Sequence, residues 1–353
     1  MTDADPPVAT GPSSVKGPAL LVMTLLLAAL AAYNAYLWAL PRPTHRATLM
    51  HMGLAQPTTN TLLPAYTDAD GDLVADAPAD PAQLIDPDPL TFSYVASKEA
   101  EHYQRVWEPF VAHLAATTGR RVEYVAFSSN ANQLKAVKEG KLHVCGLNTG
   151  SMPTAVNACG FVPAFTMGRT DGEAGYKMLI ITPADSSIRG VPELRGHMIA
   201  FTSMGSNSGF KAPTVILMHD FGMEPERDYL WAFSFGHNQS IQGVATGRYE
   251  AAAVASDMLD RAVGRGDVKR ESLRVLYESE RFPMAGLGYV YNLKPGLVAK
   301  VREAFRSFDW KGTTLETEFA PTGVVKFIPL SYKDDFALVR RIDDAMGVRH
   351  AIE

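Results

Sequence analysis

The chain contains little cysteine, no excess of positive charge and no glycine-rich phosphate loop. Its 353 residues include two cysteines, Cys145 and Cys159, which are not spaced as a C-x-x-C pair. They could form one disulfide, stay free or bind a soft ligand, and burial as two small apolar residues is the favoured interpretation. The formal net charge of −5 gives no support for a nucleic-acid partner. Neither G-x-x-x-x-G-K-S/T nor G-x-G-x-x-G occurs, so no nucleotide cofactor is expected.

One long apolar run lies near the N-terminus. Residues 19–40 carry no charge and are numerous enough to span a bilayer as a helix. Ala29-Leu30-Ala31 resembles a signal-peptidase site, so a cleaved signal peptide is the alternative. Because the run continues through Tyr36-Leu37-Trp38, with aromatic residues at its far end, an uncleaved anchor is preferred. We expect a cytoplasmic tail at residues 1–18, a single transmembrane helix at 19–40, and a periplasmic or extracellular domain held at the inner membrane.

Residues 41–89 are rich in proline, alanine, threonine and aspartate and lack periodicity, which predicts a linker. Within them four aspartates follow a D-x-D-G-D-x-x-x-D pattern that resembles the calcium-binding loops of thrombospondin type 3 repeats. Only one copy occurs and the glycine position does not fit an EF-hand, so an acidic solvated linker is the preferred interpretation. The weaker calcium candidates are Asp68, Asp70, Asp72 and Asp76.

From Leu90 onward, strand-like and helix-like segments alternate in two series. The first series has strand patterns at residues 91–95, 121–127 and 142–147, with helical patterns between them. The second series begins with a strand pattern at 176–181. Alternation of this kind predicts an α/β fold in which helices cover largely parallel sheets. Two series predict two lobes with a cleft between them.

The segment 205–213 lies between a strand-like run and an apolar helix-like run. The first backbone N–H groups of a helix have no internal partner and carry partial positive charge, so such a turn can receive oxyanion oxygens. Ser206, Asn207 and Ser208 add side-chain donors to this turn. Small polar residues before a helix also serve as an ordinary N-cap, which is the alternative interpretation.

Several short segments fall in a characteristic order. They are Trp107-Glu108-Pro109-Phe110, the S-x-S-G-F-x-x-P pattern at 206–213, Phe235-Gly236-His237 and Ser256-Asp257-Met258-Leu259-Asp260. In this order they resemble the phosphate-, phosphite- and phosphonate-binding (PhnD-like) branch of the type II periplasmic substrate-binding proteins of ABC transporters. The resemblance runs from about residue 90 to about residue 309.

This resemblance implies two lobes, joined by two crossing segments, that close on a ligand. Lobe 1 is expected at residues 90–170 and 284–353, and lobe 2 at 171–283, with crossings near 165–176 and 278–288. The resemblance also implies that an oxyanion binds in the turn around Ser208 and that a histidine reaches it. The expected ligand-binding residues are Ser206, Asn207, Ser208, Gly209, His237, Asp257, Asn130, Asn148, Thr149 and Tyr176.

Some of these residues have alternative roles. Protonated, His237 would add charge to the site, and neutral it would still donate one N–H. Asp257 matches an acidic position at the substituent end of the ligand, but it could equally cap the following helix. Cys145 lies on a strand that enters the cleft, where a thiolate would suit arsenite. A buried strand cysteine is the preferred interpretation of that residue.

The chain also departs from the family pattern at positions that would recognise an amino-alkyl group on the ligand. Where phosphonate-binding members carry Pro-x-Asp-Pro, this chain has Pro283-Met284-Ala285-Gly286. Tyrosines common in the family align here with Asn130 and Leu147. The loss of one acid and two tyrosines argues against an ammonium-bearing ligand. Neutral donors would suit a small oxyanion such as phosphate or phosphite.

We therefore predict a membrane-anchored extracytoplasmic protein that binds phosphate, phosphite or phosphonate in the cleft for ABC-type uptake, without catalysis and without a cofactor. The alternative partner is a membrane histidine kinase that would use the same lobes to sense phosphate or arsenite. An enzyme acting on phosphorylated substrates is a third possibility, because Ser208, His237 and Asp257 occur in a triad order. Their local sequences are not those of a nucleophile elbow, so binding is preferred over catalysis.

Overall fold

The computed structural model describes residues 16–39, 62–97, 99–348, 350 and 352, in two compact units, Met1–Thr44 and His45–Glu353. Helix α1, Lys16–Ala39, lies in the first unit and covers most of the predicted transmembrane segment. Among the described residues, no helix meets the length and hydropathy required to cross a membrane. The predicted cytoplasmic tail falls largely outside the described residues.

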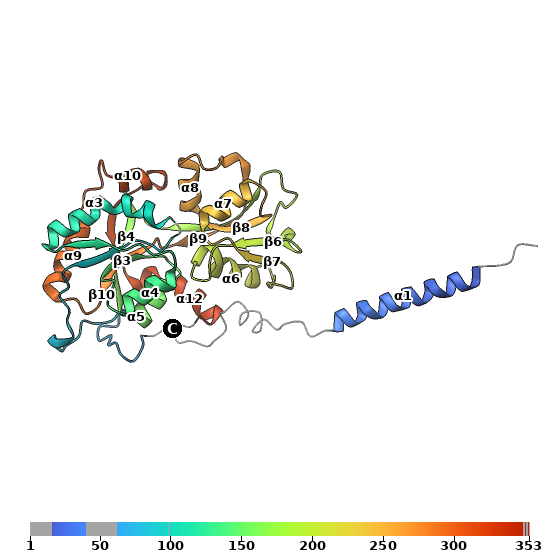
Figure 1. The fold of residues 1–353 in the computed structure, drawn as a ribbon, viewed down its shortest axis with the longest axis horizontal. Coiled ribbons are helices and arrows are strands. Elements are labelled where there is room, and N and C mark those ends of the chain that lie inside the picture. The colour runs from blue at the N-terminus through green and yellow to red at the C-terminus, as the bar shows by residue number, and fades with distance from the viewer. Residues whose placement is uncertain (1–15, 40–61, 98, 349, 351, 353) are drawn as a thin grey trace, which may run out of the picture. The chain divides into compact units, whose positions relative to one another are not determined.

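Within the described part of the second unit, two sheets form, each with helices on both sides (Figure 1). The first has the strand order β11-β4-β10-β3-β1-β2 and the second has the order β7-β6-β8-β5-β9. The strands of the first sheet are β1 (Leu90–Ser93), β2 (Val122–Tyr124), β3 (Val144–Leu147), β4 (Phe161–Arg169), β10 (Gly286–Val290) and β11 (Val324–Pro329). Those of the second are β5 (Tyr176–Pro183), β6 (Met198–Phe201), β7 (Leu230–Phe233), β8 (Ala251–Ala255) and β9 (Leu273–Phe282).

Helices connect the strands in both sheets. On the first sheet they allow β1 to pair in parallel with both β2 and β3, and on the second they allow β6 to pair in parallel with β7 and β8. Every residue of β3 and β8 is buried, as expected for short apolar strands that are covered on both faces. The α-helices are α3 (Ala100–Thr118), α4 (Asn130–Lys138), α5 (Met152–Cys159), α6 (Ala212–His219), α7 (His237–Ala245), α8 (Ser256–Gly264), α9 (Pro295–Ser307), α10 (Thr314–Phe319), α11 (Tyr332–Asp335) and α12 (Ala337–Met346).

The chain passes from one sheet to the other twice, between β4 and β5 and between β9 and β10. Both passages are shorter than the crossing segments expected from the sequence, because β4 runs to Arg169 and β9 runs to Phe282. Neither α5 nor β4 was expected from the sequence pattern. Pro109 does not begin α3 but lies inside it, where the fully buried Trp107 and Phe110 hold the helix on the sheet.

The predicted linker is wrong in its second half, because residues 62–89 pack on the lobe built around the first sheet. Leu63 donates a backbone hydrogen bond to the carbonyl of Asn157 at 2.9 Å. The ring of Tyr66 meets that of Tyr291 edge-on, with centroids 5.0 Å apart, and Val74 is buried in the core. A few apolar residues in a polar stretch are enough to anchor it, although the average composition conceals them.

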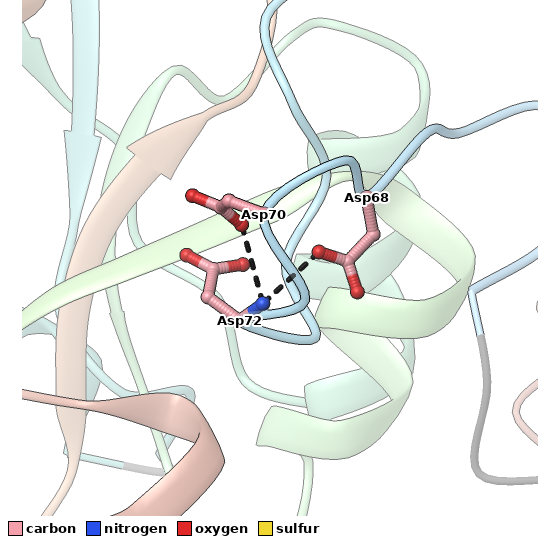
Figure 2. Close-up of side chains that lie close together, drawn as sticks. All are labelled: Asp68, Asp70 and Asp72. Atoms are coloured by element: carbon pink, nitrogen blue, oxygen red, sulfur yellow. Dashed lines mark hydrogen bonds between the residues drawn. The ribbon is translucent and has the colours of Figure 1, made fainter.

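The aspartates of this segment form a tight turn. Asp68, Asp70 and Asp72 lie close together, with one carboxylate oxygen from each within 4.8 Å of the others (Figure 2). Asp68 accepts hydrogen bonds from the backbone N–H groups of Gly71 and Asp72, and Asp72 accepts one from Val74. Burial raises the pKa of Asp72, and the negative charges of the neighbouring aspartates add to this rise. The hydrogen bond from Val74 opposes it. These carboxylates therefore order their own loop, in the manner of Asx turns.

Candidate ligand-binding cleft

A cavity of about 500 Å³ lies where loops of the two sheets face each other. Its walls come from the ends of β1 and β3, from the segment after β6, from the starts of α7 and α8, and from the passage between β9 and β10. All of the predicted ligand residues except Gly209 line it. Those that do are Asn130, Asn148, Thr149, Tyr176, Ser206, Asn207, Ser208, His237 and Asp257.

The predicted oxyanion turn is a π-helical turn, Asn207–Lys211, that runs directly into α6. Ser206 is its N-cap, and its hydroxyl oxygen accepts the N–H of Gly209 at 3.0 Å. The turn can therefore act both as an N-cap and as an oxyanion-binding turn. We call this turn, residues 205–211, the cradle. The N–H of Gly209 is occupied by the cap, and a Cβ at that position would meet the Thr202 hydroxyl at 2.0 Å. Gly209 is thus required for packing, which sequence reasoning missed.

Tyr176 joins the cradle to the opposite lobe. Asn207 donates from its side-chain amide to the Tyr176 hydroxyl at 3.2 Å. Thr149, from the loop after β3, donates to the carbonyl of Pro283 at 2.8 Å. Burial raises the pKa of Tyr176, despite hydrogen bonds with Thr149, Asn207 and Ser208. The phenol therefore keeps its proton and is a neutral donor at the centre of the cleft.

His237 is the first residue of α7, and its ring nitrogens have different roles. Nδ1 accepts the backbone N–H of Ala255 at 3.2 Å, so the proton of the neutral ring is on Nε2. Burial lowers the pKa of His237 to about 4, and the positive charge of the nearby Arg261 contributes to the same shift. Of the two states that the sequence left open, the structure favours the neutral imidazole, which offers one N–H donor.

Several polar atoms around the cradle have no hydrogen-bond partner among the described residues. They include the side-chain oxygens of Asn130, Asn207 and Thr202. Asn148 accepts the N–H of Ser151 through its Oδ1 at 2.8 Å, which leaves its amide N–H groups for other partners. Buried polar atoms are normally paired in native proteins, and two of these atoms are amide oxygens, which can only accept a hydrogen bond.

The cavity lining also holds a charged cluster that sequence reasoning missed. Arg261, on α8, donates to the hydroxyl of Tyr103 at 3.1 Å and to Glu318 at 3.2 Å. It also lies 4.0 Å from Asp257, one turn earlier on the same helix. Burial raises the pKa of Asp257, and Arg261 opposes that shift. The Asp257–Arg261 spacing of four residues was the available signal, since such pairs face each other on a helix.

Two other sequence positions lie away from the cavity. Cys145 is buried in β3, outside the lining, and burial raises the pKa of its thiol well above the usual value. Cys145 and Cys159 are both free. A buried thiol cannot offer a thiolate to the cleft, so the arsenite interpretation gains no support. Leu147, which aligns with a family tyrosine, is also buried outside the lining.

The geometry of a donor-lined cavity between two α/β lobes is that of a solute-binding protein, and comparison with known proteins assigns the family. The family described as "ABC transporter, phosphonate, periplasmic substrate-binding protein" matches residues 92–336. The chain belongs to this family. Members of the phosphonate-binding family are extracytoplasmic substrate-binding components of ABC transporters and not enzymes, so the sequence prediction of the family and of a non-catalytic protein is confirmed.

Individual relatives agree with this assignment. The phosphate-import protein PhnD of Mycolicibacterium smegmatis is 25% identical over 244 residues, which cover 64% of this chain and 75% of that protein. The binding component of an ABC phosphonate transporter from Pseudomonas aeruginosa is 18% identical, with a TM-score of 0.63 over 73% of this chain and 86% of that one. PhnD1 of Prochlorococcus marinus, solved with methylphosphonate, is 14% identical, with a TM-score of 0.63 over 74% and 99% of the chains. These structural matches confirm the two-lobe α/β fold.

Proposed function

We propose that this phosphonate-binding family member captures a tetrahedral phosphorus oxyanion in the cleft and delivers it to an ABC permease. The observation that supports this proposal is a set of neutral donors, from several elements, that line one cavity. The first N–H groups of the π-helical turn, the Asn207 and Ser208 side chains, Tyr176 and the Nε2–H of His237 all belong to its lining. Each hydrogen bond to a charged oxygen contributes about 1.5–3 kcal/mol, so neutral donors alone can hold a dianion.

The relatives support this class of ligand. The M. smegmatis protein is named for phosphate import, and the P. marinus protein was solved with methylphosphonate. We extend only the shared chemistry to this chain, a tetrahedral phosphorus centre with several oxygens. Transport is favoured over the sensor-kinase alternative because the relatives named are import components.

We also propose that α1 tethers the binding domain to the membrane. Most of its described side chains are apolar, and all are exposed, including Leu21, Leu25 and Leu26 at 61–65% of their full areas. They belong to the uncharged run at 19–40, and a tether raises the local concentration of a binding domain near a membrane partner.

The cradle is tested by Ser208→Ala, with phosphate, phosphite and methylphosphonate titrated in a calorimeter. Loss of one charge-assisted hydrogen bond should weaken binding by about 10- to 150-fold, with little change in the melting temperature. Ser307→Ala is the matched control, because Ser307 lies on α9 outside the cavity. Unchanged affinity of Ser208→Ala would show that the oxyanion binds elsewhere.

A further inference from the structure

The cavity is much larger than the oxyanion that its cradle can hold. Its volume is about 500 Å³, whereas one water molecule accounts for about 30 Å³ of the liquid. A phosphate ion has five heavy atoms and would replace only a few such waters. Cavities of about 300–1,000 Å³ are the size that encloses drug-sized organic ligands. The space beyond the cradle is therefore large enough for a substantial substituent on the oxyanion.

An aromatic wall bounds this space on the side of the first sheet. Tyr94, just after β1, and Tyr103, on α3, both line the cavity, with ring centroids 5.1 Å apart. Tyr94 stacks on the buried Trp107 at 4.5 Å. Gly146 leaves room for this ring, since a Cβ there would lie 2.9 Å from its Cδ2 atom. Packing thus fixes the wall before any ligand arrives.

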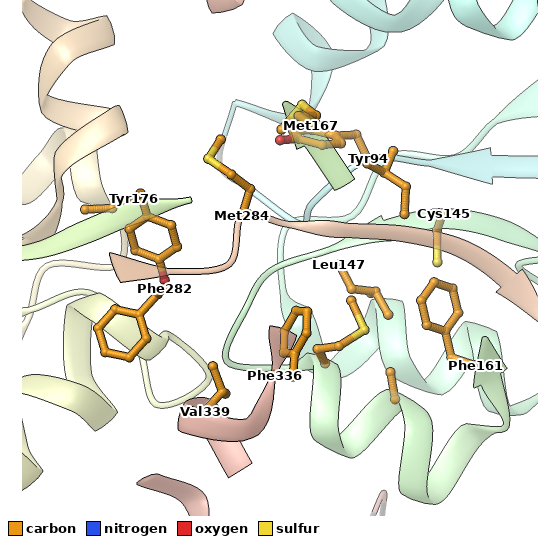
Figure 3. Packing of buried hydrophobic residues seen from close by; sticks show 14 of the residues in the cluster. Tyr94, Cys145, Leu147, Phe161, Met167, Tyr176, Phe282, Met284, Phe336 and Val339 are labelled. Carbon is orange, nitrogen blue, oxygen red and sulfur yellow. The ribbon is translucent and has the colours of Figure 1, made fainter. Parts of the chain in front are cut away.

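Methionine side chains complete the apolar lining. Met284 lies in the passage between β9 and β10, Met167 on β4 and Met258 on α8, and all three line the cavity. In Figure 3, Met284 lies between Tyr176 on one side and Tyr94 with Met167 on the other. Thioether side chains are flexible and make favourable contacts with aromatic rings. This lining therefore suits a flat apolar group.

A further aromatic residue, Phe235, is exposed and has a strained backbone conformation. Phe235 lines the cavity, is 63% exposed and has a φ of 67°. A positive φ is an outlier for a bulky side chain, and such strain clusters at ligand-binding positions. The Phe235 N–H donates to the carbonyl of Thr202 at 2.9 Å, which holds this residue beside the cradle segment.

The described lining holds three charged side chains, Glu99, Asp257 and Arg261. Arg261 pairs with Asp257 and with Glu318, whereas Glu99 accepts the neutral side-chain amide of Asn238 at 2.7 Å. A second anionic group on the ligand would have to break the buried pairs of Arg261, which is costly. The charges in the lining therefore disfavour a second anionic group, and the methionine and tyrosine side chains favour an apolar one.

We propose that the ligand is a tetrahedral phosphorus oxyanion that carries an uncharged, apolar, ring-sized substituent, as in an arylphosphonate or an aryl phosphate ester. This proposal rests on the proposed function, because the cradle must hold the oxyanion. The sequence predicted a small oxyanion, namely phosphate, phosphite or a phosphonate, and the present proposal differs in the size of the ligand. That expectation used the neutral donors near the cradle and had no measure of the cavity volume.

Calorimetry on the full-length chain tests the proposal with five probes: phosphate, methylphosphonate, 2-aminoethylphosphonate, phenylphosphonate and phenyl phosphate. Phenylphosphonate or phenyl phosphate should bind at least about tenfold more tightly than methylphosphonate, which corresponds to about 1.4 kcal/mol. The tighter of the two phenyl ligands distinguishes a carbon–phosphorus link from an ester link. A preference for methylphosphonate, phosphate or 2-aminoethylphosphonate would overturn the substituent proposal and leave the oxyanion cradle standing.

Variants at Met284 provide a second readout. Met284→Gln keeps the side-chain length but adds a polar end, so the ratio of phenylphosphonate to methylphosphonate affinity should fall severalfold. Met284→Leu, the matched apolar control, should preserve that ratio, and melting curves check the fold of both. Equal ratios in the two variants and the wild type would contradict the proposed pocket. If none of the five probes binds to the folded chain, both the substituent proposal and the proposed function fail.

Discussion

At the scale of single residues, the cleft uses neutral donors where a charged group was an open option. His237 accepts the backbone N–H of Ala255 through Nδ1 and keeps its proton on Nε2. Burial keeps Tyr176 protonated as well. Neutral donors can bind an oxyanion without the desolvation penalty of burying a separate counter-ion. The proposed oxyanion affinity should therefore depend on hydrogen-bond geometry more than on net charge.

The depressed pKa of His237 predicts a pH dependence of stability. Its value is about 4 in the folded chain against about 6.5 when unfolded, so the unfolded chain binds more protons between these values. The contribution is fully present above about pH 6.5 and is lost as the pH falls toward 4, by roughly 3 kcal/mol in total.

We expect His237→Gln to flatten the fall in the free energy of unfolding between pH 7 and pH 4.5, measured by urea denaturation without ligand. The glutamine can still accept the Ala255 N–H. His219→Gln, at an exposed position on α6, should retain the wild-type slope. The same slope in His237→Gln as in the wild type would contradict a neutral imidazole at this half-buried position.

At the scale of elements, the π-helical turn joins three parts of the binding domain. Lys211 on this turn is buried and donates to the carbonyl of Gly150 at 2.7 Å, in the loop between β3 and α5. It also pairs with the buried Asp343 on α12 at 2.8 Å. The cradle, the loop of the opposite lobe and the C-terminal helix are therefore held by one side chain.

Gly150 provides a test of this contact between elements. A Cβ on Gly150 would lie 2.4 Å from the carbonyl oxygen of Gly205 and 2.5 Å from the amide nitrogen of Asn207. These are backbone atoms of the cradle segment, so they cannot move aside without distorting the turn. Gly150→Ala should weaken oxyanion binding at least about tenfold while each lobe stays folded.

Calorimetry and thermal melting measure the two effects of Gly150→Ala. Gly296→Ala, on α9, is the matched control, because an added Cβ there meets nothing within 4 Å. Wild-type affinity in Gly150→Ala would mean that the loop and the cradle do not approach this closely when ligand is bound.

The same scale shows how much of the site was predictable. The cradle could be found because Ser206, Asn207 and Ser208 are adjacent in the sequence and start a helix, which is a local property. The Arg261–Glu318 pair could not, since α8 and α10 are far apart in the sequence and meet only after folding. Gly209 was assigned to the ligand, although its N–H is used by the cap.

At the scale of the whole molecule, side chains bridge the two lobes on several sides of the cleft. Arg261 reaches Glu318 and Tyr103, and Asn238 reaches Glu99. Together with Lys211 they hold the lobes in contact around the cavity. Ligand binding and lobe closure are therefore expected to be coupled, as in hinge-bending proteins.

The proposed membrane tether belongs to this scale, and fractionation tests it. The full-length chain should remain in the membrane pellet after alkaline carbonate washing, because about 20 apolar residues can span a bilayer. A variant lacking residues 1–44 should be released in soluble form and still bind oxyanion. A soluble mature protein cut after residue 31 would favour the signal-peptide alternative and contradict the tether.

Sequence patterns alone predicted most of the strands and helices, without α5 and β4, as well as the start of the cradle helix and the family. Those features depend on the spacing of apolar residues and on short motifs, which act locally along the chain. The tertiary structure alone decided the volume of the cavity, the neutral state of His237, the pairing of Arg261 and the packing of residues 62–89. Each of these depends on distances between residues remote in sequence, because burial and partners exist only after the two lobes have packed together.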